Sequence, residues 1–319
     1  MDTTERMPET LIEAIRFFAD PDVCLAFVAK LRWPGGVACP RCGSGEHSFL
    51  STRRVWKCKG CKKQFSVKVG TIFEDSPLGL DKWLPALWMV VNCKNGISSY
   101  EMARALGVTQ KSAWFMNHRI RLAVQEGTFE PMSGEVEVDE TYIGGAARFM
   151  HQSRKDRKIK GQTGMVGKTA VMGLLERHGE DGHSKVRAKV VPNAKKKTLA
   201  PEVRKHVVAG SEVFTDALSS YTDLSDAYAH QVIDHAECYV KGKIHTNGLE
   251  NFWSLLKRSI KGTYVSVEPF HLFRYLDEQT YRFNTRKVKD GARFLHAAAG
   301  IIGKRLTYKA LTASEVPAT

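Results

Sequence analysis

The chain has 319 residues, of which 43% are hydrophobic and 26% are charged. This composition fits a folded chain of two or three domains and excludes collagen, a coiled coil and wholesale disorder. Lysine and arginine number 48 against 34 acidic residues, and the net charge of +14 favours a polyanionic partner such as nucleic acid. Charge alone also allows a basic surface that contacts only solvent.

Membrane and targeting segments are not expected. The longest apolar stretch, residues 84–91, is far shorter than the roughly 20 residues of a membrane helix. The first ten residues are polar and carry both charge signs, unlike a signal peptide or a transit peptide. We therefore expect a cytoplasmic protein without a membrane partner.

The sequence divides into five segments with different patterns. Apolar residues recur at helical spacing within residues 1–32, and a turn-rich, cysteine-bearing stretch with short strands follows at 33–69. The pattern is helical again at 78–130. Strand-like and helical runs alternate over 134–285, which predicts a mixed sheet flanked by helices, and 286–319 is a basic C-terminal extension. We expect a multidomain chain with a small β domain, an all-α domain and an α/β domain.

Four cysteines in the second segment have the spacing of a metal site. Cys39 and Cys42 form one pair, and Cys58 and Cys61 form another after fifteen intervening residues. This is the two-knuckle spacing of a tetrahedral zinc site, and four thiolates leave no open position for a reacting water. We expect a zinc ribbon at 33–69 with one structural zinc ion per chain. The other cysteines lack such partners and are expected to pack as small hydrophobic residues: Cys24, Cys93 and Cys238.

The third segment contains the pattern of two short helices. Ser98 or Ser99 can cap the first helix, which ends at Gly107, and the second starts after Thr109. The pattern predicts a helix-turn-helix DNA-binding domain at 78–130, with an ordinary helical hairpin as the alternative. The polar residues of the second helix are the expected DNA contacts: Lys111, Asn117, His118, Arg119 and Arg121.

Three acidic residues of the α/β segment stand out by their position. Asp139 lies in a strand of period two, with Glu135 and Glu137 on the same face, and Asp216 ends another short strand. Glu250 lies on a later amphipathic helix. Acids at strand ends are where α/β sheets present ligands to solvent. These three acids are therefore candidate active-site residues.

The same amphipathic helix carries two further polar candidates. Lys257 follows Glu250 by two turns and projects on the same side, and Asn247 precedes Glu250 by one turn. Two aspartates and a glutamate supply the hard oxygen ligands that a pair of Mg²⁺ ions, or Mn²⁺ as a substitute, needs for phosphoryl transfer. Lys257 would then contact a substrate phosphate. Taken singly, each acid is better explained as part of a solvated surface or an ion pair.

Three motifs surround the acids: VDETYIGG at Asp139, VFTDALSSY at Asp216 and HTNGLENFWSLLKRSIKGTY at Glu250. Together with FHLFRYLDEQTYRFNTR at 270–286 and the cysteine segment, they resemble the DDE transposases of bacterial insertion sequences, of the group related to eukaryotic Merlin elements. The resemblance covers residues 33–293. It implies an RNase H-like catalytic domain whose metal-binding acids are these three, separated by 76 and 33 residues.

The resemblance also implies a function and its partners. Such a transposase binds terminal inverted repeats and catalyses Mg²⁺-dependent strand cleavage and transfer, acting on double-stranded DNA of the element ends and the target. Work on two ends at once implies a homodimer or a larger synaptic complex, associated with the bacterial nucleoid when bound to DNA. Some members have asparagine at the third position, so Asn247 remains an alternative to Glu250. We prefer Glu250 because a carboxylate brings negative charge to a second metal ion.

A run of basic residues follows the first acid motif. Seven lysines and arginines against one aspartate occupy residues 148–168, which predicts an exposed loop near the proposed cleft. These residues and one on the amphipathic helix are candidate DNA contacts: Arg154, Lys155, Arg157, Lys158 and Lys257. Solubility alone is the alternative explanation of this run.

Two rival functions remain open. A zinc-bearing DNA-binding regulator that has lost catalysis accounts for everything before residue 131 equally well, but it has no need for three converging acids. A structure-specific, metal-dependent nuclease of the same fold would cleave DNA without joining it.

Overall fold

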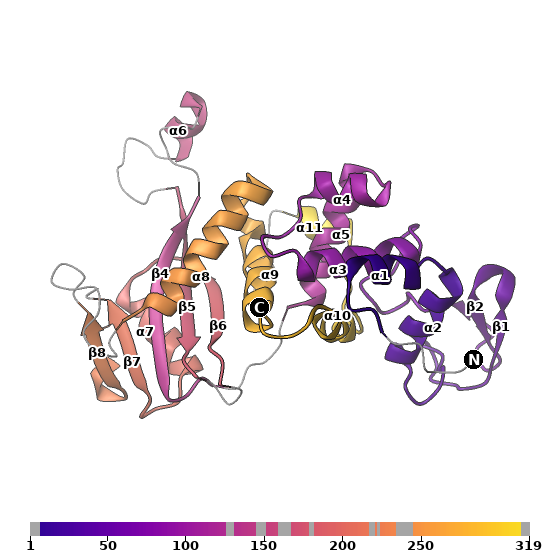
Figure 1. Ribbon diagram of the computed structural model, residues 1–319, viewed down its shortest axis with the longest axis horizontal. Coiled ribbons are helices and arrows are strands. Elements are labelled where there is room, and N and C mark those ends of the chain that lie inside the picture. The colour runs from indigo at the N-terminus through magenta and orange to yellow at the C-terminus, as the bar shows by residue number, and fades with distance from the viewer. Residues whose placement is uncertain are drawn as a thin grey trace. The chain divides into compact units, whose positions relative to one another are not determined.

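The structure, a computed structural model, describes residues 7–125, 131–144, 151–158, 167–178, 182–216, 221, 224–233 and 245–313. The chain falls into two compact units (Figure 1). The first unit contains the residues up to 125 together with those from 285 onward, and the second contains the residues between them. Among the residues described, no helix is long and apolar enough to cross a membrane.

The first unit contains a small antiparallel sheet at the cysteine segment. Its strands follow one another in sheet order: β1 (His47–Leu50), β2 (Val55–Cys58) and β3 (Gln64–Phe65). Trp56 and Phe65 stack across β2 and β3 with their ring centroids 5.9 Å apart, and Trp33 meets both rings edge-on. The expected small β domain is therefore present, with an aromatic cluster as its core.

Two helices precede this sheet, where the sequence predicts one helical segment. They are α1 (Leu11–Phe17) and α2 (Pro21–Arg32). The break falls at Asp20, whose carboxylate accepts the Asp22 backbone N–H and caps α2. Pro21 occupies the first position of α2, where its missing N–H costs nothing, whereas it could not continue α1. A cap followed by proline therefore starts a new helix.

The helical segment that follows contains three helices: α3 (Leu80–Asn92), α4 (Ser99–Leu106) and α5 (Gln110–Ala123). A capping box between Ser98 and Glu101 starts α4. The helix ends at Gly107, whose φ of 63° is a left-handed conformation that glycine adopts without strain. Thr109 then accepts the Ser112 N–H and caps α5. The two short helices are therefore present where the pattern predicts them.

The C-terminal residues belong to the first unit. They contain two helices: α10 (Asp290–Ala299) and α11 (Tyr308–Thr312). Phe294 of α10 is fully buried, and its ring centroid lies 5.5 Å from that of Phe18 and 5.3 Å from that of Trp88. The sequence predicts a basic extension at 286–319 because its charge is conspicuous. The apolar side of α10 decides instead where this part of the chain packs.

The second unit is built on a five-stranded mixed sheet. Its strands in chain order are β4 (Glu135–Ile143), β5 (Thr169–Glu176), β6 (Lys185–Val191), β7 (Glu212–Asp216) and β8 (Ala229–Ile233). Their order in the sheet is β6-β5-β4-β7-β8, with β4, β7 and β8 parallel and the pairs β4–β5 and β5–β6 antiparallel. Glu137 is in register with Phe214. Asp139 and Asp216 each follow this pair by two residues, on neighbouring parallel strands.

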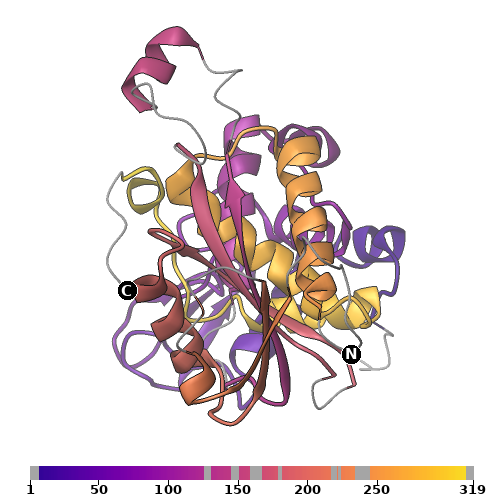
Figure 2. The same cartoon turned by 90° about the vertical axis from the view of Figure 1, so that its left-hand side faces the viewer.

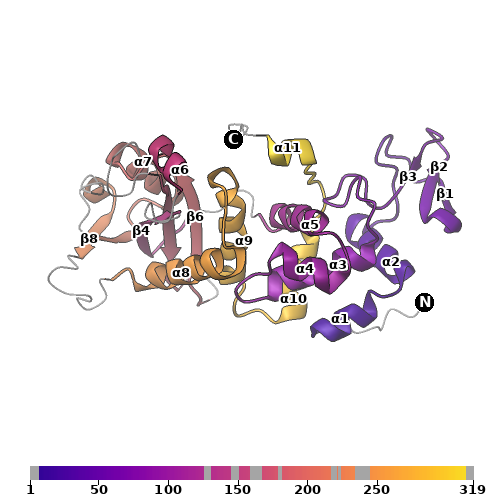
Figure 3. The ribbon, with the colours of Figure 1, turned by 90° about the horizontal axis from the view of Figure 1, so that it is seen from above.

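Helices cover both faces of the mixed sheet (Figure 3). Three of them are α7 (Lys196–His206), α8 (Asn247–Arg258) and α9 (Leu272–Asn284). On one face, Leu199 and Val203 of α7 pack in a core with Val136 and Val138, whereas α8 and α9 pack on the other face. Because side chains alternate along a strand, β4 directs its valines toward α7 and Asp139 toward α8.

Shorter elements complete the described chain. Helix α6 (Gln152–Lys158) lies apart from the sheet (Figure 2), so the basic segment expected to be a loop contains a short helix. Helix α8 continues into a π-helical turn at Ser259–Tyr264. The described 3₁₀ turns are Ser51–Arg53, Leu224–Asp226 and Pro269–His271. The predicted zinc-ribbon sheet, helical part and mixed sheet flanked by helices are therefore present.

Candidate functional site

The four cysteines of the ribbon bring their sulfur atoms together. The Sγ atoms of Cys39 and Cys61 are 3.7 Å apart. Those of Cys42 and Cys58 are 3.6 Å apart, and all four lie within 4.8 Å of one another. A tetrahedral zinc ion with Zn–S bonds of about 2.3 Å holds its sulfur ligands about 3.8 Å apart. The donor set and its spacing therefore fit the predicted structural zinc ion.

A backbone N–H group prepares one of these sulfur atoms for a metal. The Cys61 N–H donates to the Cys58 sulfur, which lowers the pKa of Cys58 to about 6 and favours the thiolate form that binds zinc. Within the described ranges, this is the one group of three or more His, Cys, Asp or Glu residues whose ligand atoms approach so closely. Cys24 is fully buried and Cys93 is half-buried, whereas Cys238 lies outside the described residues.

Most side chains expected to contact DNA from α5 are buried. Asn117, His118, Arg119 and Arg121 expose no more than 4% of their surface. The prediction that these four side chains form a DNA-contacting surface is therefore wrong. Lys111, in the first turn of α5, is exposed.

Arg119 explains why α5 carries polar residues on its buried side. Its guanidinium donates to the carbonyl oxygens of Ile72 and Glu74 at 2.9 and 2.7 Å. It also donates to the Leu306 carbonyl at 3.0 Å and stacks over the Phe115 ring. Buried carbonyl groups need hydrogen-bond donors, and a helix side chain supplies them here. Sequence pattern alone does not separate this use of arginine from a nucleic-acid contact.

Asp139 lies in the middle of β4 with both carboxylate oxygens hydrogen-bonded. Its Oδ2 accepts the indole N–H of Trp253 from α8 at 2.8 Å, and its Oδ1 accepts the Glu140 backbone N–H at 2.8 Å. Gly173 on β5 is the register partner of Asp139. A Cβ at position 173 would lie 2.5 Å from the Trp253 ring. Glycine therefore lets the indole cross β5 and reach the carboxylate.

The charges of two predicted acids act on the third, and we call Asp139, Asp216 and Glu250 the acid cluster. Burial raises the pKa of Asp139 to about 6, and the negative charges of Asp216 and Glu250 add to this rise. The hydrogen bond from Trp253 acts in the opposite direction. Asp216 is half-buried at the end of β7, and Glu250 is exposed on α8. Three elements therefore contribute negative charge to one place, where a divalent cation would relieve the repulsion.

A fourth carboxylate, which the sequence pattern does not single out, lies beside the acid cluster. Glu140 accepts the Tyr221 hydroxyl at 2.7 Å. Burial raises the pKa of Glu140 to about 7, although the hydrogen bond from Tyr221 acts in the opposite direction. The charges of Asp216 and Asp139 add to the rise. The sequence feature that could have indicated Glu140 is its position next to Asp139. Neighbouring residues of a strand point to opposite faces, so the alternating pattern separates the two acids.

Helix α8 presents a polar face beside the acid cluster. Its apolar side is buried as the pattern predicts: Leu249, Phe252, Trp253 and Leu256. Asn247, Glu250 and Lys257 are all exposed. They follow one another at helical spacing and therefore share one side of the helix.

Exposed cations lie on both units. Six of them lie on the ribbon: Arg41, Arg53, Lys57, Lys59, Lys62 and Lys63. In the second unit, Lys155 of α6 is exposed. For three further residues of α6 that are expected to contact DNA, the structure describes only the backbone: Arg154, Arg157 and Lys158.

Comparison with known proteins assigns both the ribbon and the mixed sheet. Residues 131–284 match the family described as ISXO2-like transposase domain, and residues 20–64 match the family described as transposase zinc-ribbon domain. A protein of Halobacterium salinarum, described as "Uncharacterized protein in transposable element ISH50", is 26% identical over 255 residues. The match covers 76% of this chain and 84% of that protein. The chain belongs to the DDE transposases of insertion sequences that carry an N-terminal zinc ribbon.

Proposed function

We propose that this protein binds the terminal inverted repeats of its insertion sequence, cleaves DNA strands there and joins them to target DNA. The acid cluster is the observation that carries this proposal. Its members come from two neighbouring parallel strands and one helix, yet the charges of Asp216 and Glu250 act on Asp139. The mixed sheet, in which two parallel strands follow on one side of β4, supports an RNase H-like fold for this unit.

The acid cluster would hold the catalytic metal ions. Its three carboxylates are hard oxygen ligands of the kind that Mg²⁺ prefers and Mn²⁺ also takes. The raised pKa of Asp139 fits a site whose negative charges a divalent cation neutralises. When bound, a pair of such ions supplies Lewis-acid activation and compensates charge on the phosphate.

Two phosphoryl transfers would occur at this site. In the first, a water oxygen bonds to the phosphorus at an element end and the bond from phosphorus to the 3′ oxygen breaks. The water loses a proton, and the leaving 3′ oxygen gains one. In the second, the freed 3′ hydroxyl loses its proton and bonds to a target phosphorus, and a target 3′ oxygen leaves as a hydroxyl. Lys257 would contact a phosphate, and Asn247 would orient the reacting group from the same side of α8.

Exposed basic side chains would hold the DNA through its phosphates. The ribbon cations named above and Lys111 would contact the element ends, and Lys155 and Lys257 would contact DNA near the acid cluster. Contacts of this kind lose affinity as salt rises, because bound counterions are released. Joining two ends to one target requires both ends in one complex, so we extend the proposal to a homodimer or larger assembly on the bacterial nucleoid.

Strand cleavage by the full-length protein tests the proposal. The protein is incubated with Mg²⁺ and DNA that carries the element ends and their flanks. Replacing Asp139, Asp216 or Glu250 with alanine should reduce cleavage by about 100-fold or more, because each removes an oriented charge from the reaction. End binding should remain. Lys257→Ala should lose less activity, because this side chain positions a phosphate and holds no metal.

Asp226→Ala is the matched control, because this carboxylate is exposed and ion-paired at the surface. Normal cleavage by all three acid variants would overturn the proposal. Activity in Glu250→Ala together with its loss in Asn247→Ala would reassign the third ligand. Cleavage without joining would favour a structure-specific nuclease, and end binding without cleavage would favour a regulator.

A further inference from the structure

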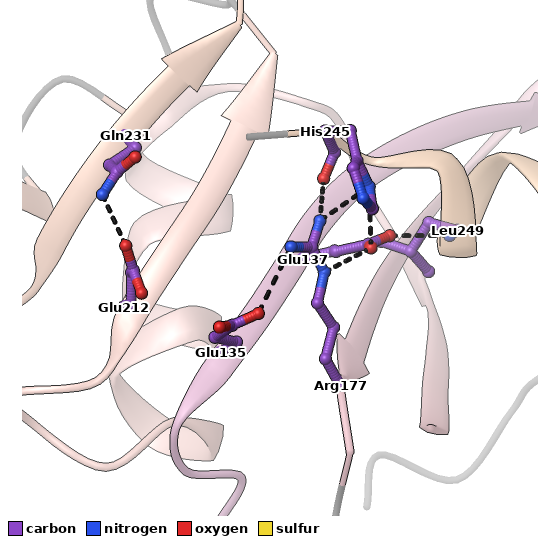
Figure 4. Close-up of polar contacts among 7 residues, drawn as sticks. All are labelled: Glu135, Glu137, Arg177, Glu212, Gln231, His245 and Leu249. Atoms are coloured by element: carbon purple, nitrogen blue, oxygen red, sulfur yellow. Dashed lines mark hydrogen bonds and ion pairs between the residues drawn. The ribbon is translucent and has the colours of Figure 1, made fainter. Parts of the chain in front are cut away.

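Glu137 is a buried carboxylate that the proposed reaction does not use. It lies on β4 two residues before Asp139, and its side chain is 1% exposed. Its Oε1 accepts the Arg177 Nε–H at 2.7 Å and lies 3.5 Å from Nδ1 of His245 (Figure 4). Its Oε2 accepts the backbone N–H of Leu249 at 2.9 Å. Both oxygens are therefore occupied by protein donors inside the fold.

These contacts hold the first turn of α8. The first N–H groups of a helix have no partner within the helix, and Thr246 at the N-cap makes no side-chain capping bond. Glu137 supplies the missing acceptor from a neighbouring strand, and its negative charge suits the positive end of the helix dipole. Arg177 adds a second attachment, because it bonds to Nδ1 of His245 at 2.8 Å and donates to the His245 carbonyl.

Gly248 permits this close approach. A Cβ at position 248 would lie 2.9 and 3.1 Å from the two carboxylate oxygens of Glu137 and 2.8 Å from Leu175. Glycine normally weakens a helix relative to alanine. Its place in the first turn of α8 is therefore explained by contact with the strand.

The contacts of Arg177 reach every element that carries a member of the acid cluster. The guanidinium pairs with Glu137, two residues before Asp139 on β4. It stacks over Phe214 at 4.3 Å, two residues before Asp216 on β7. Through Glu137 it is joined to Leu249, one residue before Glu250 on α8. One buried ion pair thus lies behind all three acids.

We propose that Glu137 and Arg177 form a positioning clamp that sets Glu250 against Asp139 and Asp216. The clamp rests on the proposed function, since it serves the acid cluster of that reaction. Glu137 holds no metal, because both its oxygens face protein donors and its side chain is buried. Breaking the pair releases the start of α8 and with it the third metal ligand.

Amide hydrogen exchange of the full-length protein tests the clamp without reference to activity. In Glu137→Gln, exchange in the first turn of α8, residues 247–251, should quicken about tenfold, because a charge-assisted bond to the helix end is lost. Glu212→Gln is the matched control: it makes the same change on the same sheet, where Glu212 accepts a hydrogen bond from Gln231. Its exchange at 247–251 should equal that of the unmodified protein.

Cleavage as a function of Mg²⁺ concentration tests whether the clamp positions Glu250 for metal binding. Glu137→Gln and Arg177→Gln should each raise the half-saturating Mg²⁺ concentration at least about threefold, with end binding unchanged, because the third ligand is less well placed. The double variant should be no worse than the poorer single variant, since both changes break one unit. A structural loss of folded protein would lower the maximal rate and leave the Mg²⁺ dependence unmoved.

Gly248→Ala provides a variant that keeps both charges. It should raise the half-saturating Mg²⁺ concentration, because the added Cβ pushes against Glu137, even though alanine favours a helix. Gly262→Ala should leave this concentration unchanged, because a Cβ at position 262 would meet open space. Unchanged exchange in Glu137→Gln would overturn the clamp whatever the protein's activity. Faster exchange with unchanged Mg²⁺ dependence would overturn its role in positioning Glu250. An unmodified protein that cleaves no DNA would overturn the proposed function, and the exchange data would still decide whether the clamp holds α8.

Discussion

The two candidate metal centres of this protein are built in opposite ways. The cysteine cluster comes from two turns fifteen residues apart, and its sulfur atoms already lie within 4.8 Å of one another. The acid cluster comes from three elements separated by 76 and 33 residues, and in the described part of the chain its oxygens form no group that close. The first is a closed shell suited to holding a fold together, and the second is an open one suited to chemistry.

The difference also lies in charge. Backbone N–H groups stabilise the thiolate of Cys58, which is the form that binds metal. The acid cluster does the reverse, because burial and neighbouring charges favour the protonated form of Asp139. The zinc site is thus prepared by local contacts, whereas the proposed reaction site is assembled by the fold at some cost in stability.

Removing the zinc ligands should cause the largest loss of stability among these predictions. We expect this loss only at the cysteine cluster and not at the acid cluster. Replacing Cys39 and Cys58 together with serine should abolish zinc binding and unfold the ribbon, because structural zinc contributes about 10–16 kcal/mol of apparent binding free energy in zinc-finger peptides. The zinc content measured by metal analysis should fall from one ion per chain to none. Cys93→Ser, outside the cluster, should keep its zinc. Zinc retained by the double variant would remove the distinction between the two centres.

The ribbon and the elements that carry the acids could be predicted because their signals are local. Cysteine spacing indicates the metal site, and alternation or helical spacing indicates β4 and α8. Four of the five DNA contacts expected on α5 were wrong, and Arg119 shows a physical reason. Arg119 is basic and polar in any sequence pattern, but in the fold it satisfies carbonyls at residues 72, 74 and 306. No sequence pattern near Arg119 indicates that these carbonyl groups will be its partners.

The surroundings of the acid cluster could not be predicted for the same reason. Glu137 alternates with valines and reads as a solvent-facing acid, yet it is buried. Its partners Arg177 and Leu249 lie 40 and 112 residues away in the chain. The glycines that allow these approaches, at 173 and 248, are recognisable only once the tryptophan and the carboxylate that they face are known.

The pH dependence of stability should distinguish the acid cluster from an ordinary surface. The pKa of Asp139 is raised from 3.8 to about 6, so its favourable contribution to folding is complete below about pH 4 and is lost as the pH rises through 6. Without added divalent metal, Asp139→Asn should therefore stabilise the protein near pH 8, by up to about 3 kcal/mol in the free energy of unfolding. The two proteins should converge near pH 4.

Thermal unfolding followed by circular dichroism measures this effect. Added Mg²⁺ should raise the melting temperature of the unmodified protein near pH 8 and should raise that of Asp139→Asn much less, since the variant lacks one ligand charge. Asp226→Asn, an exposed acid, should melt like the unmodified protein at both pH values. Equal melting of Asp139→Asn and the unmodified protein near pH 8 would show that the acid cluster costs the fold nothing.

The smallest expected effect tests whether the protein adjusts the acid cluster through a single hydrogen bond. Trp253→Phe keeps an aromatic ring beside Gly173 but removes the N–H that donates to Asp139. That bond lowers the pKa of Asp139 against burial, so its loss should raise this pKa further. A proton then competes better with metal for the carboxylate. The cleavage rate should fall by up to about tenfold below about pH 7 and should be unchanged above about pH 8. The acidic limb of the pH–rate profile therefore moves to higher pH.

Trp88→Phe is the matched control for this change, because Trp88 is a buried tryptophan of the first unit, packed against Phe294. Its pH–rate profile should overlay that of the unmodified protein. If the profile of Trp253→Phe also overlays it, the indole only fills space beside Gly173. The acid cluster would then resemble the ribbon in one respect, because the position of its backbone, without a hydrogen bond from a side chain, would determine the reactivity of Asp139. A shifted limb in Trp253→Phe alone would mean that a side chain of the helix core adjusts the reactivity of the strand acid.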